Sequence, residues 1–232
     1  MRKIVLFLLV LTIVLSSCAS NDEEMQTTKE IDKSTLYIVV DPGHGLYDVG
    51  ALHEENLGEI TEAMINFAVA KELSNELTMR GYNVIMTHDG STAPDTEGDA
   101  AVFTPSERAE FSNSQNADLF ISIHCDSYPE NDEVYGTRVY YARNKIHNTK
   151  NDKKFAKAIA KCINKKFPDD KSVIIKEMDG ADSYTVLYKS NVPAVLIECG
   201  FITSKKDAEK LTNAEWQKNF ATALADGIDN YF

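Results

Sequence analysis

The apolar residues of this chain form two patterns that alternate along it. Continuous apolar runs bounded by polar or turn residues predict strands buried on both faces. They lie at Leu36–Val40, Asp118–Ile123 and Ala194–Ile197. Apolar residues spaced three or four apart predict helices over about 60–80, 151–167 and from Asn213 onward. Strands that alternate with helices are typical of βαβ units and a mostly parallel sheet.

Weaker patterns fill the intervals between these elements. Tyr82–Thr87 is a further strand, and Thr104-Pro105-Ser106-Glu107 has capping-box spacing, with proline at the first helical position. Thr137–Tyr141 is predicted as an edge strand, and short strands are predicted at Ser172–Ile175 and Tyr184–Leu187. We find no repeats and no second domain. We therefore expect one α/β domain, in which helices flank both faces of a central, mostly parallel β-sheet.

The first residues differ from the rest of the chain. Arg2 and Lys3 precede the apolar run Ile4–Leu15, which is too short to span a bilayer and is typical of an export signal. Leu15-Ser16-Ser17-Cys18 resembles the lipobox of bacterial lipoproteins, in which the cysteine is acylated and becomes the new N-terminus. An ordinary signal peptide with an incidental cysteine is the alternative.

These features predict three segments. Residues 1–17 are a signal peptide, 18–35 are a lipidated Cys18 with a flexible polar tether, and 36–232 are the folded domain. The protein is then expected outside the cytoplasm, as a cell-envelope lipoprotein anchored to the membrane.

Composition narrows the range of partners. The chain has 232 residues and a formal net charge of −12. Nucleic-acid binding needs clustered Lys and Arg, so this acidic balance argues against it. The lysine-rich run Lys150–Lys166 is interpreted as the solvated face of its helix. Three cysteines remain after Cys18, which is not a disulfide framework. We expect a monomer.

Chemically capable residues stand at the ends of the three buried strands. His44 follows the first between two glycines, His124 ends the second and Glu198 ends the third. The carboxyl ends of parallel strands lie on one side of a sheet, where ligands bind in open α/β folds. Glu62 lies three residues before Ile65, on the apolar stripe of the helix that follows the first strand. It should therefore point inward at the same edge.

Two imidazoles and a carboxylate with an open fourth position are the usual ligands of a catalytic zinc ion, and a further carboxylate can act as general base. Spacing alone does not establish this set, because the residues are far apart and no compact His-Glu-x-x-His run exists. Glu54, Glu55 and Glu59 also precede the helix and are read as solvated acids, with Glu55 as the alternative ligand.

Five segments together carry a resemblance to a known family. They are Ile38–Gly45, Thr61–Asn66, Ser106–Arg108, Ala117–His124 and Pro193–Phe201. In these segments the chain resembles the zinc-dependent N-acetylmuramoyl-L-alanine amidases of the Amidase_3 type, over nearly all of 36–232. The resemblance implies one Zn²⁺ per chain, with His44, Glu62 and His124 as ligands and Glu198 as the catalytic glutamate.

The resemblance also implies the reaction. Water activated by zinc, with Glu198 as general base and then general acid, would hydrolyse the amide between N-acetylmuramic acid and L-alanine in peptidoglycan. Peptidoglycan, and the membrane through the lipid anchor, are then the expected partners. The alternatives are an inactive amidase-like lipoprotein that binds the wall and a zinc peptidase that acts within the stem peptide.

Four further residues are candidates for substrate contact or for support of the site. His88 stands where the family often has arginine, Asp126 where it commonly has asparagine, and Arg108 matches a structural arginine. Surface positions are the alternative for His88 and Arg108. Leu187 is a candidate substrate contact, with packing as the simpler interpretation. His53 and His147 lie in polar loops and are read as solvated.

Two cysteines directly follow proposed site residues. Because side chains alternate along a strand, Cys125 and Cys199 should point away from the metal. We interpret them as small buried residues. If their strands are neighbours, the two sulfurs could lie close enough to be oxidised in an exported protein.

Overall fold

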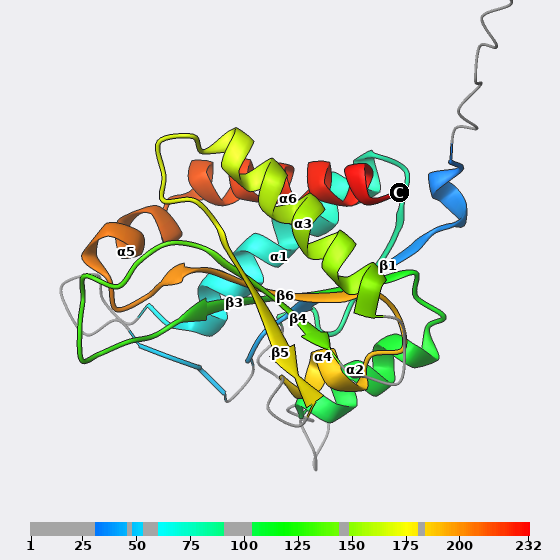
Figure 1. The fold of residues 1–232 in the computed structure, drawn as a ribbon, viewed down its shortest axis with the longest axis horizontal. Coiled ribbons are helices and arrows are strands. Elements are labelled where there is room, and N and C mark those ends of the chain that lie inside the picture. The colour runs from blue at the N-terminus through cyan, green and yellow to red at the C-terminus, as the bar shows by residue number, and fades with distance from the viewer. Residues whose placement is uncertain (1–30, 46–47, 53–59, 91–103, 144–148, 181–183) are drawn as a thin grey trace, which may run out of the picture. The chain divides into compact units, whose positions relative to one another are not determined.

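A six-stranded sheet with the order β2-β1-β3-β6-β4-β5 organises the chain (Figure 1). The computed structural model describes residues 31–45, 48–52, 60–90, 104–143, 149–180 and 184–232. All neighbouring strands run parallel except β4 and β6, which confirms the predicted mostly parallel sheet. The strands are β1 Tyr37–Pro42, β2 Asn83–Met86, β3 Leu119–Asp126, β4 Arg138–Arg143, β5 Ile174–Asp179 and β6 Ala194–Phe201.

Helices cover both faces of this sheet, as predicted. In the order of the chain they are the 3-10 helix η1 Lys33–Thr35, α1 Glu62–Met79, α2 Pro105–Ser114, α3 Thr149–Lys166, α4 Thr185–Lys189, α5 Lys205–Leu211 and α6 Ala214–Tyr231. Helices α1, α3 and α6 pack together on one face, and α2 packs with α4 on the other (Figure 1). Within the described residues, no helix is both long and apolar enough to cross a bilayer.

Local sequence signals set the helix ends. Helix α1 starts where the Thr61 hydroxyl accepts a hydrogen bond from the Met64 backbone N–H. The predicted capping box is present, because Thr104 and Glu107 bond reciprocally at the start of α2. Asn213 caps α6 through the Trp216 N–H, as its sequence position predicts. Each cap satisfies a backbone donor that has no partner within its helix.

Two apolar clusters explain why the predicted strands are continuously apolar. Alternate residues of a strand point to opposite faces of the sheet. In β1, Ile38 and Val40 belong to the larger cluster, under α1, α3 and α6, whereas Val39 belongs to the smaller cluster on the other face. Both faces are therefore buried, and neither admits polar side chains until the strands reach their carboxyl ends.

Two sequence predictions differ from the structure, and one helix had no prediction. β4, at the predicted edge strand Thr137–Tyr141, is an internal strand, because β5 pairs with its outer side and forms the edge. The predicted strand Tyr184–Leu187 is instead the start of α4, where the Tyr188 N–H bonds to the Tyr184 carbonyl. A short apolar run does not distinguish a strand from a helical turn. Helix α5 was not predicted.

Candidate active site

The turn after β1 brings the first histidine to the edge of the sheet. The Gly43 N–H donates to the Ile123 carbonyl at 2.8 Å, which ties the turn to β3. His44 has a φ of 61°, a left-handed conformation that few residues other than glycine adopt. A Cβ on Gly43 would lie 2.2 Å from the His124 ring. Glycine at this position therefore allows the two histidines to come together.

A buried ion pair holds this turn in place. Asp41 is fully buried, and its Oδ1 accepts hydrogen bonds from Arg108 Nη1 at 2.8 Å and from the Thr87 hydroxyl at 2.7 Å. Its Oδ2 accepts from the Ser122 hydroxyl at 2.7 Å. Arg108 also donates to the carbonyls of Pro42 and His44, each at 2.7 Å. Arg108 is thus a buried structural residue rather than a surface one.

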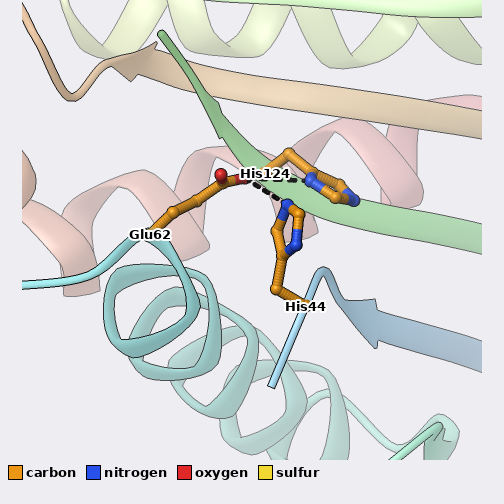
Figure 2. Close-up of side chains that lie close together, drawn as sticks. All are labelled: His44, Glu62 and His124. Carbon is orange, nitrogen blue, oxygen red and sulfur yellow. Dashed lines mark hydrogen bonds and ion pairs between the residues drawn. The ribbon is translucent and has the colours of Figure 1, made fainter. Parts of the chain in front are cut away.

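Three side chains from separate elements meet beside the turn (Figure 2). Glu62, at the N-terminus of α1, places Oε1 3.1 Å from His44 Nε2 and 3.0 Å from His124 Nδ1. One ligand atom from each residue lies within 4.8 Å of the others. In a tetrahedral zinc site with bonds near 2.1 Å, ligand atoms are about 3.4 Å apart. The two nitrogens and one oxygen therefore fit a single divalent ion with a small adjustment.

Neighbouring groups orient these ligands. His44 Nδ1 lies 2.8 Å from Asp48 Oδ2 and donates its proton there, while Nε2 faces Glu62. The other Glu62 oxygen, Oε2, accepts from the Ala51 N–H at 3.0 Å. Asn66 Nδ2 lies 3.2 Å from both Glu62 Oε1 and the Gly43 carbonyl. Asp48 and Asn66 were not predicted as site residues, although each stands four positions after a predicted ligand.

The charges at this centre are strongly coupled. Burial opposes ionisation of both His44 and Glu62, but their mutual interaction outweighs it. With Asp48 contributing, the pKa of His44 is raised to about 9. Hydrogen bonds from His124 and His44 hold the pKa of Glu62 well below its usual range. A carboxylate that attracts positive charge from two sides is suited to a cation.

Glu198 lies at the same edge, on the strand next to His124. The β3–β6 register pairs the two residues directly. Glu198 is buried, and its Oε2 makes no hydrogen bond within the described part of the chain. Burial, together with the nearby Asp126 and Glu62 carboxylates, raises the pKa of Glu198 well above its usual range. A buried carboxyl with an open oxygen can accept a proton and release it again.

The remaining candidates take supporting positions. His88 Nε2 lies 2.9 Å from the Pro42 carbonyl, and its ring stacks on Phe67, so it braces the turn of His44. Asp126 pairs with Arg138 at 2.9 Å. Leu187 is fully buried in the smaller apolar cluster. Packing, the simpler interpretation of this residue, therefore accounts for its burial, and contact with substrate stays a prediction.

The two cysteines that follow site residues lie in the larger apolar cluster. Cys125 and Cys199 are both buried and both free thiols. Burial, together with the adjacent Cys199 thiol, raises the pKa of Cys125 well above its usual range. Both are therefore packing residues of the core, as interpreted from the sequence. Several other predictions lie outside the described residues: Cys18, His53, Glu54, Glu55, Glu59 and His147.

Comparisons with known proteins find similarity over most of the chain. Residues 38–230 match the family model Amidase_3, described as N-acetylmuramoyl-L-alanine amidase. The uncharacterised protein YqiI of Bacillus subtilis is 32% identical over 223 residues, 96% of this chain and 93% of that protein. The N-acetylmuramoyl-L-alanine amidase LytC of the same organism is 30% identical over 84% of this chain, which spans only 35% of LytC.

A solved structure shows the same fold. The N-acetylmuramoyl-L-alanine amidase AmiC2 of Nostoc punctiforme superimposes with a TM-score of 0.68 at 28% identity. The match covers 84% of this chain and 96% of AmiC2. The similarity therefore extends over essentially the whole AmiC2 chain.

Replacing Asp41 by asparagine should destabilise the fold by about 3–5 kcal/mol, because it leaves the Arg108 charge buried without its partner. Urea unfolding in the presence of a chelator measures this without a contribution from metal binding. Asp118→Asn is the matched control, since Asp118 accepts an exposed hydrogen bond from the Tyr37 backbone N–H. A loss no larger than that of the control would contradict this role of Asp41.

The same substitution predicts a pH dependence. Burial opposes the charge of Asp41, but Arg108 and three hydrogen bonds lower its pKa below the ordinary 3.8. Above pH 3.8, Asp41 is ionised in the folded and the unfolded protein, and the stabilisation is fully present. As the pH falls below 3.8, the unfolded chain binds a proton first, and the stabilisation is lost as the pH approaches the lower pKa of the folded protein. The difference between wild type and Asp41→Asn should therefore shrink below about pH 4. A constant difference down to pH 3 or so would contradict it.

Proposed function

Because this chain belongs to the Amidase_3 family of N-acetylmuramoyl-L-alanine amidases, we propose that it hydrolyses the amide between N-acetylmuramic acid and L-alanine in peptidoglycan. The observation that carries the proposal is the meeting of His44, Glu62 and His124 at the sheet edge where Glu198 also lies. An inactive wall-binding relative would have no need to keep all four groups in place.

The three clustered residues would hold one zinc ion per chain. When bound, this ion would polarise the amide carbonyl and lower the pKa of a water molecule towards ~7. Asp48 keeps the proton of His44 on Nδ1, so that Nε2 is available as a ligand. Glu62 stays ionised and supplies the negative charge of the site. Asn66 and the Ala51 N–H fix the direction of the Glu62 carboxylate.

Glu198 would move the proton. It takes one proton from the attacking water as the C–O bond forms, and then donates it to the alanine nitrogen as the C–N bond breaks. Both transfers are needed, because an unprotonated amide nitrogen is a poor leaving group. Its raised pKa and its unpaired Oε2 favour this exchange. Zinc dependence and this role of Glu198 are both part of the proposal.

The N-terminal segments complete the proposed protein. Residues 1–17 would be removed, Cys18 would carry the lipid, residues 18–35 would connect it to the domain, and 36–232 would act on the wall outside the cytoplasm. Within the described residues, η1 already contacts the domain through Lys33 and Asp229. The protein would act as a monomer, because one chain supplies every proposed site residue.

Digestion of purified peptidoglycan should release stem peptides with a free L-alanine amino terminus, identified by mass spectrometry. A strong chelator should abolish the release and zinc should restore it, with about one zinc per chain. His124→Ala should lose the metal, whereas His147→Ala should keep both metal and activity. A new amino terminus within the stem peptide would identify a peptidase instead. Binding to the wall without cleavage would identify an inactive binding protein.

Glu198→Gln should keep zinc and lose activity by a factor of about 10²–10⁴, because glutamine cannot accept the proton. Steady-state hydrolysis and metal content, measured on the same preparation, test this. Glu209→Gln on α5 is a matched control at an exposed position. If Glu198→Gln hydrolysed peptidoglycan as fast as wild type, Glu198 would not be the proton carrier.

With membranes washed at high salt, which screens electrostatic binding, Cys18→Ser should move the protein from the membrane fraction to the soluble fraction, because the thiol that accepts the lipid is lost. Metabolic labelling with a fatty acid and mass analysis of the mature N-terminus measure this. The wild-type protein should carry label and begin at an acylated Cys18. An unlabelled mature protein, or one that begins at another residue, would favour an ordinary signal peptide.

A further inference from the structure

The outer side of α3 concentrates positive charge on an acidic protein. This helix contains seven lysines and one aspartate, a net charge of +6, whereas the whole chain has −12. The remaining residues therefore carry a net −18. The single acid, Asp152, is buried and accepts a hydrogen bond from the Ala194 N–H of β6. It therefore does not lie among the lysines at the surface of the helix. We call the exposed lysines of α3 the lysine stripe: Lys153, Lys154, Lys157, Lys161, Lys165 and Lys166.

The spacing of the lysine stripe is costly for an isolated solvated helix. Lys153, Lys157, Lys161 and Lys165 follow one another at four-residue intervals. Like charges at this spacing destabilise a helix by roughly 0.2–0.5 kcal/mol per pair. The opposite side of α3, with Phe155, Ile159 and Ile163, packs into the larger core cluster, and this packing holds the helix despite the repulsion. A helix face that only had to be solvated could equally carry alternating positive and negative charges.

The start of the folded domain lies beside the lysine stripe. Lys33 of η1 pairs with Asp229 of α6 at 2.5 Å. Asp229 in turn lines a hollow together with Lys161 and Lys165 of α3. The chain therefore enters the domain next to the stripe, on the layer formed by α1, α3 and α6 (Figure 1).

We propose that the lysine stripe docks on the anionic surface of the membrane to which Cys18 is anchored. The choice of the membrane as the partner of the stripe rests on the proposed lipid anchor at Cys18. Residues 18–30 extend at most about 45 Å, which keeps the domain close to the bilayer. No comparable tether would hold a wall polymer close to this side of the domain. Tethering raises the local concentration of the surface, so that weak electrostatic docking suffices.

The acidic remainder of the protein does not prevent this docking. At physiological ionic strength charges are screened beyond about 8 Å, so a surface in contact with α3 interacts mainly with α3. Asp226 and Asp229, which flank the stripe, are themselves paired with Arg80 and Lys33. The sheet lies between α3 and the α2–α4 layer, and the proposed site residues lie at the carboxyl ends of its strands rather than on α3.

The test uses the chain from residue 18 onward with Cys18→Ser, so that no acyl group contributes. Flotation with vesicles of 30% or so phosphatidylglycerol in phosphatidylcholine measures binding at low and high salt, with pure phosphatidylcholine vesicles as reference. Each lysine at an anionic surface is worth about fivefold in binding. The triple variant Lys157→Gln, Lys161→Gln, Lys165→Gln should therefore bind at least about 10-fold more weakly.

A matched variant separates position from net charge. Lys189→Gln, Lys205→Gln, Lys206→Gln removes three positive charges from α4 and α5 and should bind as well as the parent protein. Amide hydrolysis of soluble wall fragments should be the same in both triple variants, so that a failed amidase proposal and a failed docking proposal are distinguished. Equal binding by both triple variants, or no preference for anionic vesicles, would overturn the proposal. Stripe-dependent binding to an anionic wall polymer alone would assign the stripe to that polymer instead.

Discussion

The candidate active site depends on one buried ion pair, between Asp41 and Arg108. Asp41 ends β1, and Arg108 reaches it from α2, on the other side of the sheet from α1. The same guanidinium holds the carbonyls of Pro42 and His44. Two charges without solvent would be costly, and hydrogen bonds to both Asp41 oxygens and from both terminal nitrogens of Arg108 offset this cost. The result is a turn that holds His44 in a left-handed conformation, facing α1.

This clamp explains how residues so far apart in sequence form one centre. Parallel pairing of β1, β3 and β6 brings His44, His124 and Glu198 to the same edge. Helix α1 supplies Glu62 from its first turn, which lies near the carboxyl ends of the strands. Asn66, one helical turn later, bonds both to Glu62 and to the Gly43 carbonyl, and so links the helix to the turn. The ligands are thus held by rigid elements, except that His44 relies on the clamp.

The sequence predicted those parts of the fold that depend on short-range patterns. The buried strands, the caps of α2 and α6 and the inward phase of Glu62 follow from periodicity and local hydrogen bonding. The internal position of β4 was not predicted, because it depends on a partner, β5, whose side chains are mostly exposed and carry no strong apolar pattern. The helix α4 was missed because the apolar run Thr185–Leu187 suits either structure. Asp48 and Asn66 act through geometry that no spacing rule ranks above surface polar residues.

Negative and positive charges lie on separate surfaces of the molecule, which the net charge of the chain does not show. At the sheet edge, the Glu62 and Asp48 carboxylates lie beside the histidine nitrogens, and this negative charge favours a divalent cation. On α3, the lysine stripe gathers positive charge on a separate layer, beside the point where the chain enters the domain. A net charge of −12 describes neither surface. Since electrostatic interactions in salt act over about one Debye length, each binding partner interacts mainly with the charges of the surface that it contacts. An acidic protein can in this way combine a cation site with a face that suits an anionic bilayer.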